Sequence, residues 1–544
     1  MSTLQSRLEH LPADVLGLSK LARTALAEGS VNGVPVARRI EDVARLEDRH
    51  SGPVRQELVH GIDQGLTKVF GIDGLPGRAR TSLEVLGREG SLAVVTGQQP
   101  GLFAGPLYTL YKALQTCRLA AEQSRKWGVP VVPVFWNHGE DHDISEVNHT
   151  YLVNRNLDVQ KVGLPSLPAG RQPISRILLD EETNKIDAAR ALFAHTYGDY
   201  AHVDWALDLC SPRHGESLTR ALTRALTGLL GEHGLVVVEP DWIRPVLSRA
   251  LAEIVGKDPR AALRQQAMEA QQAPDGGRPA IDPETAAMVF RVDENGRQPL
   301  RLGGDGYKYD DEPGSRTPVE LAAMIVDEPE KWSAGGLLRP LVQDAVFPSC
   351  AYVGGWGELA YHAQLAGARD VCGIPRTAFV PRISCTLIEP DVEASLAKLE
   401  CPVADILRAK GEYEPPRTES AEPAVFADLK RLAGEARTSL MTQREALGAL
   451  DPSLGVALKK AASQMEGAVD KLLGKAMRVH ANHSGKGERH VRRANHSLVP
   501  RGKPQERVLG PVPSLALFGP AFVDALWREL PAISAEHIAV HLSL

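Results

Sequence analysis

The strongest constraint on the fold is a strand–helix–strand pattern in residues 91–136. The sequence SLAVVTG predicts a buried strand that ends at a glycine turn, and VPVVPVFW predicts a second buried strand. Between them, GPLYTLYKALQTCRLAAEQSRKWG has the spacing of an amphipathic helix that ends at Gly128. Two strands joined in this way imply a parallel sheet with a right-handed crossover. We therefore expect an α/β fold that binds ligands at the carboxyl ends of its strands.

Further segments extend this pattern. ESLTRALTRALTGLLGEHG predicts a helix, LVVVEP a third buried strand and RPVLSRALAEIVG another helix. Residues 270–335 change character, and MVFRVDENGRQPLRLG alternates around Asn295-Gly296, which is a strong hairpin signal. We expect an insertion packed on the sheet domain here. DAVFPSCAYVGG and TAFVPRISCTLIE return to apolar strands, whereas residues 1–90 and the segment PSLALFGPAFVDALWRELP favour helices.

Residues 425–476 have the spacing of two long helices. After a linker at 412–423, apolar residues recur at steps of three, four or seven, and Asp451-Pro452 marks the start of the second helix. This pattern predicts an antiparallel coiled-coil hairpin whose seams pair with each other or with a second subunit. The predicted seam residues are Val425, Leu429, Leu432, Ala436, Leu440, Leu447, Leu450, Leu454, Leu458, Ala461, Met465, Val469, Leu472 and Ala476.

The composition excludes several classes of protein. A chain of 544 residues is too long for one simple core, so we expect a large domain with at least one accessory domain. The formal net charge of −6 favours neither nucleic acid nor an acidic membrane surface as a partner. We expect no secretory signal, and no apolar run approaches the about 20 residues of a membrane span. The six scattered cysteines form no CxxC pair, so a reduced cytoplasm fits better than a disulfide framework or a zinc ribbon.

The loop after the first strand is rich in glycine and amide side chains. Glycines let backbone amides approach a phosphate or carboxylate, and the start of the next helix adds partial positive charge. The stretch is neither a P-loop nor GxGxxG. A tight turn with a helix cap would explain its glycines but not its paired glutamines. The candidate binding residues in this loop are Thr96, Gly97, Gln98, Gln99, Gly105, Pro106, Tyr108 and Lys112.

The loop after the second strand, FWNHGEDHDISEVNHTY, concentrates histidines and carboxylates, and three interpretations remain open. A metal site would use His138 and His142 with nearby carboxylates, although the spacing is not HExxH. A nucleotide site would use the loop to hold ribose, adenine and phosphates. A capped helix start would use Asp143 as the cap and Glu146 to complete a capping box. We expect this cap to form, but it leaves the histidines unexplained. The candidate residues are His138, Glu140, Asp141, His142, Asp143, Glu146 and His149.

A third loop of this kind lies in RPLVQDAVFPSCAYVGGWGELAYHAQL. It is either an ordinary glycine-rich turn or part of a site, and its recurrence at a third strand end favours a site. The candidate residues are Arg339, Gln343, Asp344, Gly354, Gly355, Glu358 and Tyr361. The chain from Arg478 to Arg507 is basic and rich in histidine, and it is either a solvated face or a phosphate-binding face.

Four motifs together resemble a known family. TGQQPGLFAGPLYTLYK, VPVFWNHGEDHDISEVNHTY, LRPLVQDAVFPSCAYVGGWGELAY and GKPQERVLGP are similar, in this order, to the cysteine-adding BshC family of bacillithiol synthesis. The resemblance implies a Rossmann-like core related to class I aminoacyl-tRNA synthetases, with connecting-peptide insertions and a dimerising helical arm. The sequence departs from the family pattern at Trp356, where VGGPGE has proline, and at Ala334-Gly335-Gly336.

On this basis we expect four parts in the chain. A Rossmann-like core covers residues 1–384, with an insertion around 260–335. A connector at 385–419 leads to the coiled-coil arm at 420–495. The C-terminal segment at 496–544 then returns to the core.

The resemblance also implies an activity. Members of this family would act as ligases that join cysteine to the amine of glucosaminyl malate, giving bacillithiol. Amide formation needs an activated carboxylate, so we expect ATP or another adenine nucleotide, and no metal beyond Mg²⁺ bound with it. The candidate catalytic residues are His138, Asp141, His142 and Asp143, with His138 or His142 as the general base. The motif GKPQERVLGP adds Lys503, Gln505, Glu506 and Arg507 to the binding residues.

The expected partners are the two small-molecule substrates and a second copy of the chain, bound through the arm, without nucleic acid or membrane. Two other functions remain open. A metal-dependent hydrolase or deacetylase would use the cluster from His138 to His149, and a non-catalytic dimeric scaffold would need only the coiled coil. Metal content identifies the first, and ATP consumption with cysteine separates the ligase from the scaffold.

Overall fold

The chain forms two compact units. The computed structural model describes residues 4–47, 50, 52–164, 170–179, 183–272, 278–310, 314–415, 424–483 and 487–543. The first unit combines residues 1–389 with 503–544, and the second consists of residues 390–502. Most of the linker predicted at 412–423 lies outside the described residues.

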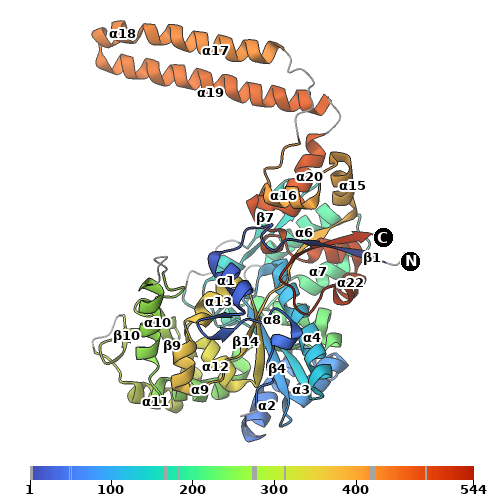
Figure 1. Cartoon of the computed structure of the whole chain (residues 1–544), viewed down its shortest axis with the longest axis vertical. Coiled ribbons are helices and arrows are strands. Elements are labelled where there is room, and N and C mark those ends of the chain that lie inside the picture. The colour runs from blue at the N-terminus through green and yellow to red at the C-terminus, as the bar shows by residue number, and fades with distance from the viewer. Residues whose placement is uncertain are drawn as a thin grey trace. The chain divides into compact units, whose positions relative to one another are not determined.

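A five-stranded parallel sheet forms the centre of the first unit (Figure 1). The strands in spatial order are β14 (Ala378–Pro381), β13 (Ser349–Gly354), β4 (Leu92–Gln98), β5 (Val131–Asn137) and β8 (Val236–Val238). The chain winds outward from β4 to β8 and then returns to β13 on the other side of β4. The strand order therefore reverses between β4 and β13, as in a doubly wound Rossmann-like sheet. The predicted fold class is confirmed.

Helices cover both faces of this sheet. One face carries α4 (Leu107–Trp127) and α8 (Leu218–Leu230). The other carries α2 (Gly52–Phe70), α3 (Gly77–Leu86), α9 (Arg244–Gly256) and α12 (Arg339–Val346). The strands alternate accordingly, because Phe135 of β5 joins the first core and Val134 the second.

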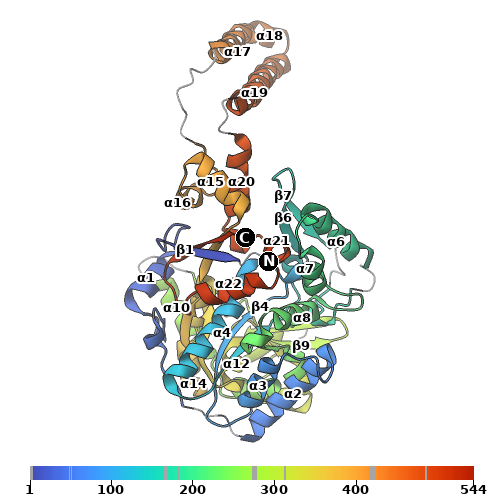
Figure 2. The same cartoon turned by 90° about the vertical axis from the view of Figure 1, so that its right-hand side faces the viewer.

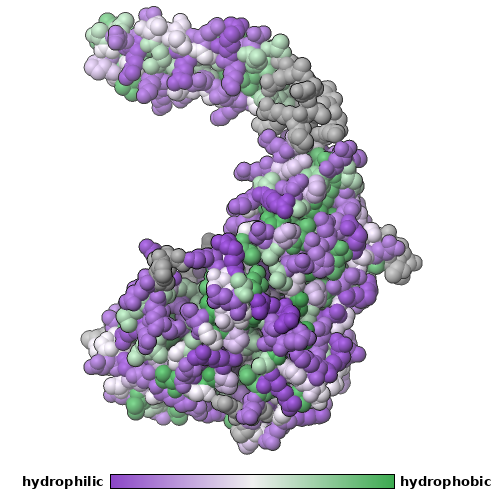
Figure 3. All heavy atoms as spheres, in the orientation of Figure 1, coloured by the Kyte–Doolittle hydropathy of each residue, from purple (hydrophilic) through white to green (hydrophobic). Residues whose placement is uncertain are grey.

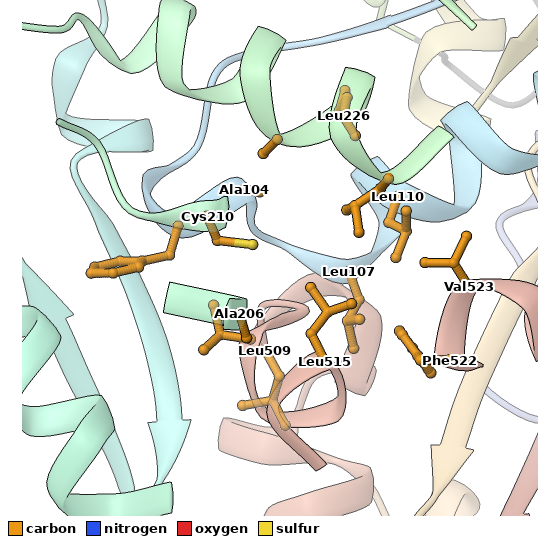
Figure 4. Close-up of a cluster of buried hydrophobic side chains, with 14 of the residues drawn as sticks. Ala104, Leu107, Leu110, Ala206, Cys210, Leu226, Leu509, Leu515, Phe522 and Val523 are labelled. Carbon is orange, nitrogen blue, oxygen red and sulfur yellow. The ribbon is translucent and has the colours of Figure 1, made fainter. Parts of the chain in front are cut away.

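The C-terminal helices complete the first of these cores. In Figure 4, Leu110 of α4, Leu226 of α8 and Phe522 of α22 (Ala521–Glu529) point into one cluster with Leu515 of α21 (Val512–Phe518). All four side chains are almost completely buried. Burying one such side chain contributes about 1.5–3 kcal/mol, so the C-terminal segment is an integral part of the sheet unit.

The insertion predicted at 270–335 contains an antiparallel sheet. Its strands in spatial order are β11 (Gly306–Tyr309), β10 (Gly296–Gly303), β9 (Ala287–Asp293) and β12 (Trp332–Ala334). Helices α10 (Arg260–Gln272) and α11 (Pro318–Asp327) accompany it. The predicted hairpin at Asn295-Gly296 is confirmed, and Gly296 has a φ of 99°, which a residue with a side chain rarely adopts.

The prediction of helices throughout residues 1–90 is wrong at the N-terminus. β1 (Gln5–Leu11) pairs antiparallel with β16 (His537–Ser543), which pairs parallel with β15 (Ser384–Ile388). Figures 1 and 2 show the two ends of the chain side by side. Because the partner of β1 lies at the far end of the sequence, no local pattern reveals the pairing. The remaining elements of the unit are α1 (Lys20–Glu28), β2 (Ser30–Val31), β3 (Val34–Pro35), α5 (Ile144–Val147), β6 (His149–Val153), β7 (Val159–Gly163), α6 (Thr183–Tyr197), α7 (Val203–Cys210), α13 (Trp356–Ala363) and α14 (Ala366–Cys372).

The second unit is helical. α15 (Pro390–Leu399) and α16 (Val403–Arg408) pack on α20 (Glu488–Leu498), as Figure 2 shows. α17 (Ala424–Thr442), α18 (Arg444–Leu450) and α19 (Pro452–His483) form the predicted antiparallel pair, hereafter the helical hairpin. Asp451 caps α19 as predicted, because its carboxylate accepts the Ser453 amide at 2.8 Å.

The register predicted for the hairpin seam is partly wrong. Leu432 and Leu472 were expected inside, but they are 51% and 54% exposed. Ala433 and Leu473 occupy the inner face instead, next to the predicted positions. α17 carries neighbouring apolar stripes, and the spacing alone does not decide which one faces α19. In Figure 3, hydrophobic residues are interspersed among hydrophilic ones on the visible face of the hairpin. Among the described residues, no helix is long and apolar enough to cross a membrane.

Candidate functional site

A cavity of about 380 Å³ opens at the carboxyl ends of the parallel strands. It lies beside β4 and β13, where the strand order reverses and where such sheets bind their ligands. Its walls come from the three predicted loops, the insertion and the C-terminal segment. The lining residues are Gln98, Gln99, Tyr108, Lys112, His138, Asp141, Ile281, Gly336, Arg339, Gly355, Gly357, Glu358, Tyr361, Arg382 and Arg507.

A buried ion pair joins two of these walls. The Lys112 side chain is 1% exposed, and its ammonium donates to Glu358 Oε2 at 2.8 Å and to the Gly97 carbonyl at 2.6 Å. Glu358 also accepts the Gly355 amide and the Tyr352 hydroxyl, each at 2.7 Å. Burial raises the pKa of Glu358, but the charge of Lys112 and these hydrogen bonds outweigh it and lower the pKa overall. Lys112, one of the predicted binding residues, is therefore already neutralised by Glu358.

Four cationic side chains, those of Lys112 and three arginines, outnumber the two carboxylates, Asp141 and Glu358, that line the cavity. Arg339 donates to the Tyr361 hydroxyl at 3.2 Å, and Arg507 is exposed at the rim. Arg382 forms an ion pair with Glu506 at 2.6 Å and lies over the Tyr108 ring, 5.3 Å from its centroid. Within the described part of the chain, neither Arg339 nor Arg507 has a carboxylate at ion-pair distance. The cavity is therefore suited to an anionic ligand.

His138 lines the cavity and carries a ring nitrogen without a partner in the described part of the chain. Its Nε2 is buried and has no hydrogen-bond partner among the described residues. Burial lowers the pKa of His138 well below its usual value, and the charges of Arg339 and Lys112 lower it further. The ring is therefore neutral at pH 7 and its nitrogen can accept a proton or a hydrogen bond. A Cβ on Gly97 would lie 2.5 Å from Nε2, so this position needs glycine.

The paired glutamines connect the first two loops. Gln98 donates to the Tyr108 hydroxyl at 3.2 Å. Gln99 donates to Asp141 Oδ2 and to Glu146 Oε2, each at 2.7 Å. The other oxygen of Asp141 accepts the amides of the next two residues, so this carboxylate shapes its own loop.

The predicted capping box is wrong. Asp143 occupies the N-cap position of α5, but its side chain accepts no bond from the helix backbone. It accepts the Ser145 hydroxyl at 2.6 Å instead, and Glu146 is bound by Gln99. α5 has only one turn, so it offers few backbone amides, and side-chain donors from Ser145 inside the helix and Gln99 outside it bind the two carboxylates instead.

The histidine-rich loop does not converge on one point. His142 points toward the insertion, where Nδ1 lies 3.3 Å from the guanidinium of Arg297. Burial lowers the pKa of His142, and the charge of Arg297 lowers it further. Glu140 is paired with Arg244, and His149 stacks edge-on against Tyr151. In the part of the chain that the structure describes, no three His, Cys, Asp or Glu residues could hold a metal ion.

Other predicted residues support the cavity from outside. The Thr96 hydroxyl donates to the Val353 carbonyl, and Asp344 forms a buried ion pair with Arg369 at 2.7 Å. The Gly105 amide donates to Leu102, so it does not face a ligand. The remaining predicted residues that do not line the cavity are the buried Gln343, Gly354, Gln505 and Glu506, the half-buried Pro106 and the exposed Lys503.

Sequence reasoning missed Arg382, Ile281, Gly336 and Gly357. Arg382 follows β14 directly, at the same edge of the sheet as the other loops. The available signal was the break PRIS inside TAFVPRISCTLIE, where one apparent apolar stretch divides into β14 and β15. Ile281 comes from the insertion and Gly336 directly follows it, and a local pattern does not give the position of the insertion over the sheet.

Comparisons with known proteins cover nearly the whole chain. Residues 36–383 match the family described as Bacillithiol biosynthesis BshC, N-terminal Rossmann-like domain, and residues 385–542 match its C-terminal coiled-coil domain. A protein of Salinibacter ruber named "Putative cysteine ligase BshC" is 30% identical over 475 residues, 86% of each chain. Proteins with the same name occur in Koribacter versatilis, 31% identical over 81% of this chain and 82% of its own, and in Geobacillus thermodenitrificans, 29% identical over 93% and 95%.

Proposed function

Because the chain belongs to the BshC family of bacillithiol biosynthesis proteins, we propose that it joins the carboxyl group of cysteine to the amine of glucosaminyl malate, forming bacillithiol. The observation that carries the proposal is the cavity at the reversal of strand order, with its excess of positive charge. Both substrates carry carboxylates, which guanidinium groups bind with charge-assisted hydrogen bonds.

The reaction needs an activated carboxylate, and we propose an adenine nucleotide as the activator. In the net reaction, the amine nitrogen forms a bond to the cysteine carbonyl carbon, one carboxylate oxygen leaves and the nitrogen loses a proton. When bound, the nucleotide would supply the chemistry that turns this oxygen into a leaving group. Gly355 and Gly357 at the start of α13 line the cavity, and no atom lies within 4 Å of a Cβ built on Gly357. The Gly355 amide is taken by Glu358, so phosphate groups would bind the guanidinium of Arg339 next to the open space at Gly357, and Mg²⁺ would enter only with the nucleotide.

His138 is our candidate for the group that receives the proton of the attacking amine. It lines the cavity, its Nε2 is unpartnered and its ring is neutral at pH 7. Asp141, held by Gln99, provides a second acceptor nearby. His142 is the weaker candidate because its ring faces Arg297 rather than the cavity.

The direct test is product formation by the purified full chain. Cysteine and glucosaminyl malate are incubated with and without ATP and Mg²⁺, and labelled thiols are identified by mass spectrometry. We expect bacillithiol only when both substrates and ATP are present, with one nucleotide consumed per product. Product without nucleotide would contradict the activation step, and no product in either condition would contradict the ligase proposal.

Two matched variants test the role of the histidines. Loss of a general base typically lowers the rate about 10²–10⁴-fold, so His138→Gln should do so. His142→Gln should stay close to the parent rate. Equal losses in the two variants at equal melting temperatures would contradict the assignment to His138.

We also propose that two copies of the chain associate through the helical hairpin. Val425, Leu432 and Leu472 expose more than half of their surface there. A hollow of about 540 Å³ on the hairpin is lined by Gly434, Arg437, Thr438, Met441, Thr442 and Glu466. Apolar surface of this kind is stabilised when a second helix pair covers it.

Light scattering tests the association. We expect a dimer for the parent chain at micromolar concentration and a monomer for the double variant L432K/L472K. Lys459→Glu, a charge change at an exposed position of the same hairpin, serves as the control and should leave the dimer intact. A monomeric parent, or a double variant that remains dimeric, would contradict the proposal.

A further inference from the structure

Two adjacent side chains of the C-terminal segment complete the free edge of β15. Gln505 accepts the Leu387 amide at 2.8 Å and donates to the Leu387 carbonyl at 3.0 Å. Glu506 Oε2 accepts the Cys385 amide at 2.9 Å. These are the backbone groups that a neighbouring strand would bind, so the two side chains take the place of a strand at this edge. Both are almost completely buried.

The other oxygen of Glu506 is directed at Arg382. Glu506 Oε1 accepts from the Arg382 guanidinium at 2.6 Å, and the two side chains are 2% and 8% exposed. Burial raises the pKa of Glu506, but the charge of Arg382 and the hydrogen bonds outweigh it, so the pKa is lowered and the pair is ionised. A second N–H of Arg382 donates to the Ile383 carbonyl at 2.8 Å. The guanidinium is therefore held on one side, and its remaining donors are available on the other.

The held guanidinium belongs to the cavity wall. The Arg382 amide donates to the Gly354 carbonyl at 2.7 Å, which ties its backbone to the end of β13. Its charge lies over the ring of Tyr108, whose hydroxyl is bound by Gln98. Contacts thus run from Glu506 through Arg382 and Tyr108 to the loop after β4. Glu506 itself does not line the cavity, so it can act on a ligand only through Arg382.

We propose that Glu506 is a positioning residue that fixes Arg382 to bind a substrate carboxylate. The inference rests on the proposed function for the identity of the substrates, cysteine and glucosaminyl malate, which both carry carboxylates. Without the Glu506 carboxylate, the arginine side chain has several rotatable bonds and no ionic anchor. Its donors would then leave the orientation that the cavity requires. Gln505 occupies the equivalent place on the same edge, and its side chain binds the Leu387 backbone through both its oxygen and its nitrogen, so it provides a matched control.

The experiment compares near-isosteric variants of the full chain. E506Q removes the charge that anchors Arg382, whereas Q505M removes two hydrogen bonds to β15 and leaves Arg382 unchanged. KM and kcat are measured for each substrate separately, and the Kd values for L-malate and for cysteine are measured by calorimetry. For one of the two substrates, we expect E506Q to raise KM, and the Kd of the matching probe, about tenfold or more, with kcat changed less. The substrate whose KM rises is the one whose carboxylate Arg382 binds.

Two further variants separate positioning from stability. Q505M should lower the melting temperature while both KM values stay at the parent level. In the double variant R382M/E506Q, KM should equal that of R382M alone, because the effect of Glu506 passes through Arg382. Since E506Q leaves a buried cation without its partner and could fail to fold, E506D, which keeps the charge but shortens the reach, should give an intermediate KM.

The outcomes distinguish this inference from the proposed function. A parent chain that forms no product but binds L-malate or cysteine, and loses that binding in E506Q, would contradict the ligase proposal and support the positioning role. Equal KM and Kd values in E506Q and the parent would overturn the positioning role. Equal changes of KM in E506Q and Q505M would also overturn it. The same holds if E506Q still raises KM in a chain that already carries R382M, or if the parent binds neither L-malate nor cysteine.

Discussion

The parallel-sheet unit and the helical hairpin both contain regularly placed apolar residues, but they bury these residues to very different extents. Val95, Val134 and Val353 in the sheet are completely buried because helices cover both faces. In the described part of the hairpin, the buried hydrophobic side chains are Ala462 and Leu473. In a pair of helices, each helix buries only the side chains that face the other helix, so further apolar side chains stay exposed. The sheet unit is thus complete by itself, whereas the hairpin has surface left for association.

Ion pairs show the same difference between the two regions. Lys112 and Glu358 pair beside the cavity with side chains 1% and 21% exposed. Arg437 and Glu466 pair across the hairpin with side chains 49% and 35% exposed. The first pair is shielded from water and salt, and the second is not. Substitutions in the two pairs should therefore differ most in their effect on stability.

Lys112→Met should have the largest effect on stability. Breaking a buried ion pair costs about 3–5 kcal/mol because the remaining charge is left without compensation. We expect a loss near the lower end, since Glu358 is partly exposed and keeps its bonds from Tyr352 and Gly355. Urea unfolding at pH 7 measures the loss. The double variant K112M/E358Q should recover most of it, and a single variant as stable as the parent would refute the role of the pair.

Gly97→Ala should have the next largest effect. The new Cβ would meet His138 Nε2 at 2.5 Å and the Trp136 carbonyl at 2.7 Å. Overpacking of this kind costs about 1–3 kcal/mol, and displacing His138 should also lower the rate of thiol formation by more than about tenfold. Gly434→Ala in the hairpin is the control, because no atom lies within 4 Å of its new Cβ. It should stabilise its helix by about 0.5–1 kcal/mol and leave the rate unchanged. An active G97A enzyme would contradict our placement of His138.

The sheet unit should also be sensitive to acid. Burial lowers the pKa of His537 to about 4, while its nitrogens contact Ser384 and Thr386 at 2.8 and 2.9 Å. In the unfolded chain the pKa is about 6.5. Between these two pKa values the unfolded state therefore binds more protons than the folded state. The contribution of His537 to the free energy of unfolding is complete above pH 6.5 and is lost as the pH falls toward 4. The expected slope is about 1.4 kcal/mol per pH unit.

The variant His537→Phe isolates this contribution. Its free energy of unfolding should fall less steeply than that of the parent between pH 6 and 4.5, whatever its stability at pH 7. Urea titrations at several pH values give both slopes. Parallel slopes would show that His537 does not titrate in the way its surroundings indicate.

Arg437→Met should have the smallest effect. Exposed ion pairs contribute about 0–1 kcal/mol to stability, and many contribute nothing measurable. Thermal melting should place this variant within about 2 °C of the parent, since a change of 1 kcal/mol shifts larger domains by about 2–4 °C. A loss as large as that of Lys112→Met would mean that the hairpin pair is covered in solution, and light scattering would then show whether a second copy covers it.

The parts of the fold that the sequence predicted depend on local patterns. β4, β5 and β8 are short apolar runs bounded by glycine, proline or polar residues, and each formed as expected. The pairing of β1 with β16 was missed because it joins the two ends of the chain. The hairpin register was partly wrong because Leu432 and Ala433 are both apolar, and only the partner helix decides which one faces it.

The candidate site was also predictable only in part. Gln98 ends β4, His138 directly follows β5 and Glu358 lies in the first turn of the helix after β13, so topology alone brings them to one edge of the sheet. The direction of each side chain was not predictable, because it depends on distant partners. His142 turns toward Arg297 of the insertion, and Arg382 is anchored by Glu506 from the C-terminal segment. A sequence pattern places residues along an edge, whereas ion pairs and packing decide which of them face the ligand.

Hydrogen–deuterium exchange of the full chain with and without cysteine and glucosaminyl malate tests most directly whether the cavity is the substrate site. We expect the substrates to protect the segments around Gln98, His138, Glu358 and Arg382, which line the cavity, and to leave α17 and α19 unchanged. R339M, which removes a guanidinium without a carboxylate partner, should weaken this protection. Protection confined to the helical hairpin, or absent from all four cavity segments while bacillithiol is being formed, would contradict the account.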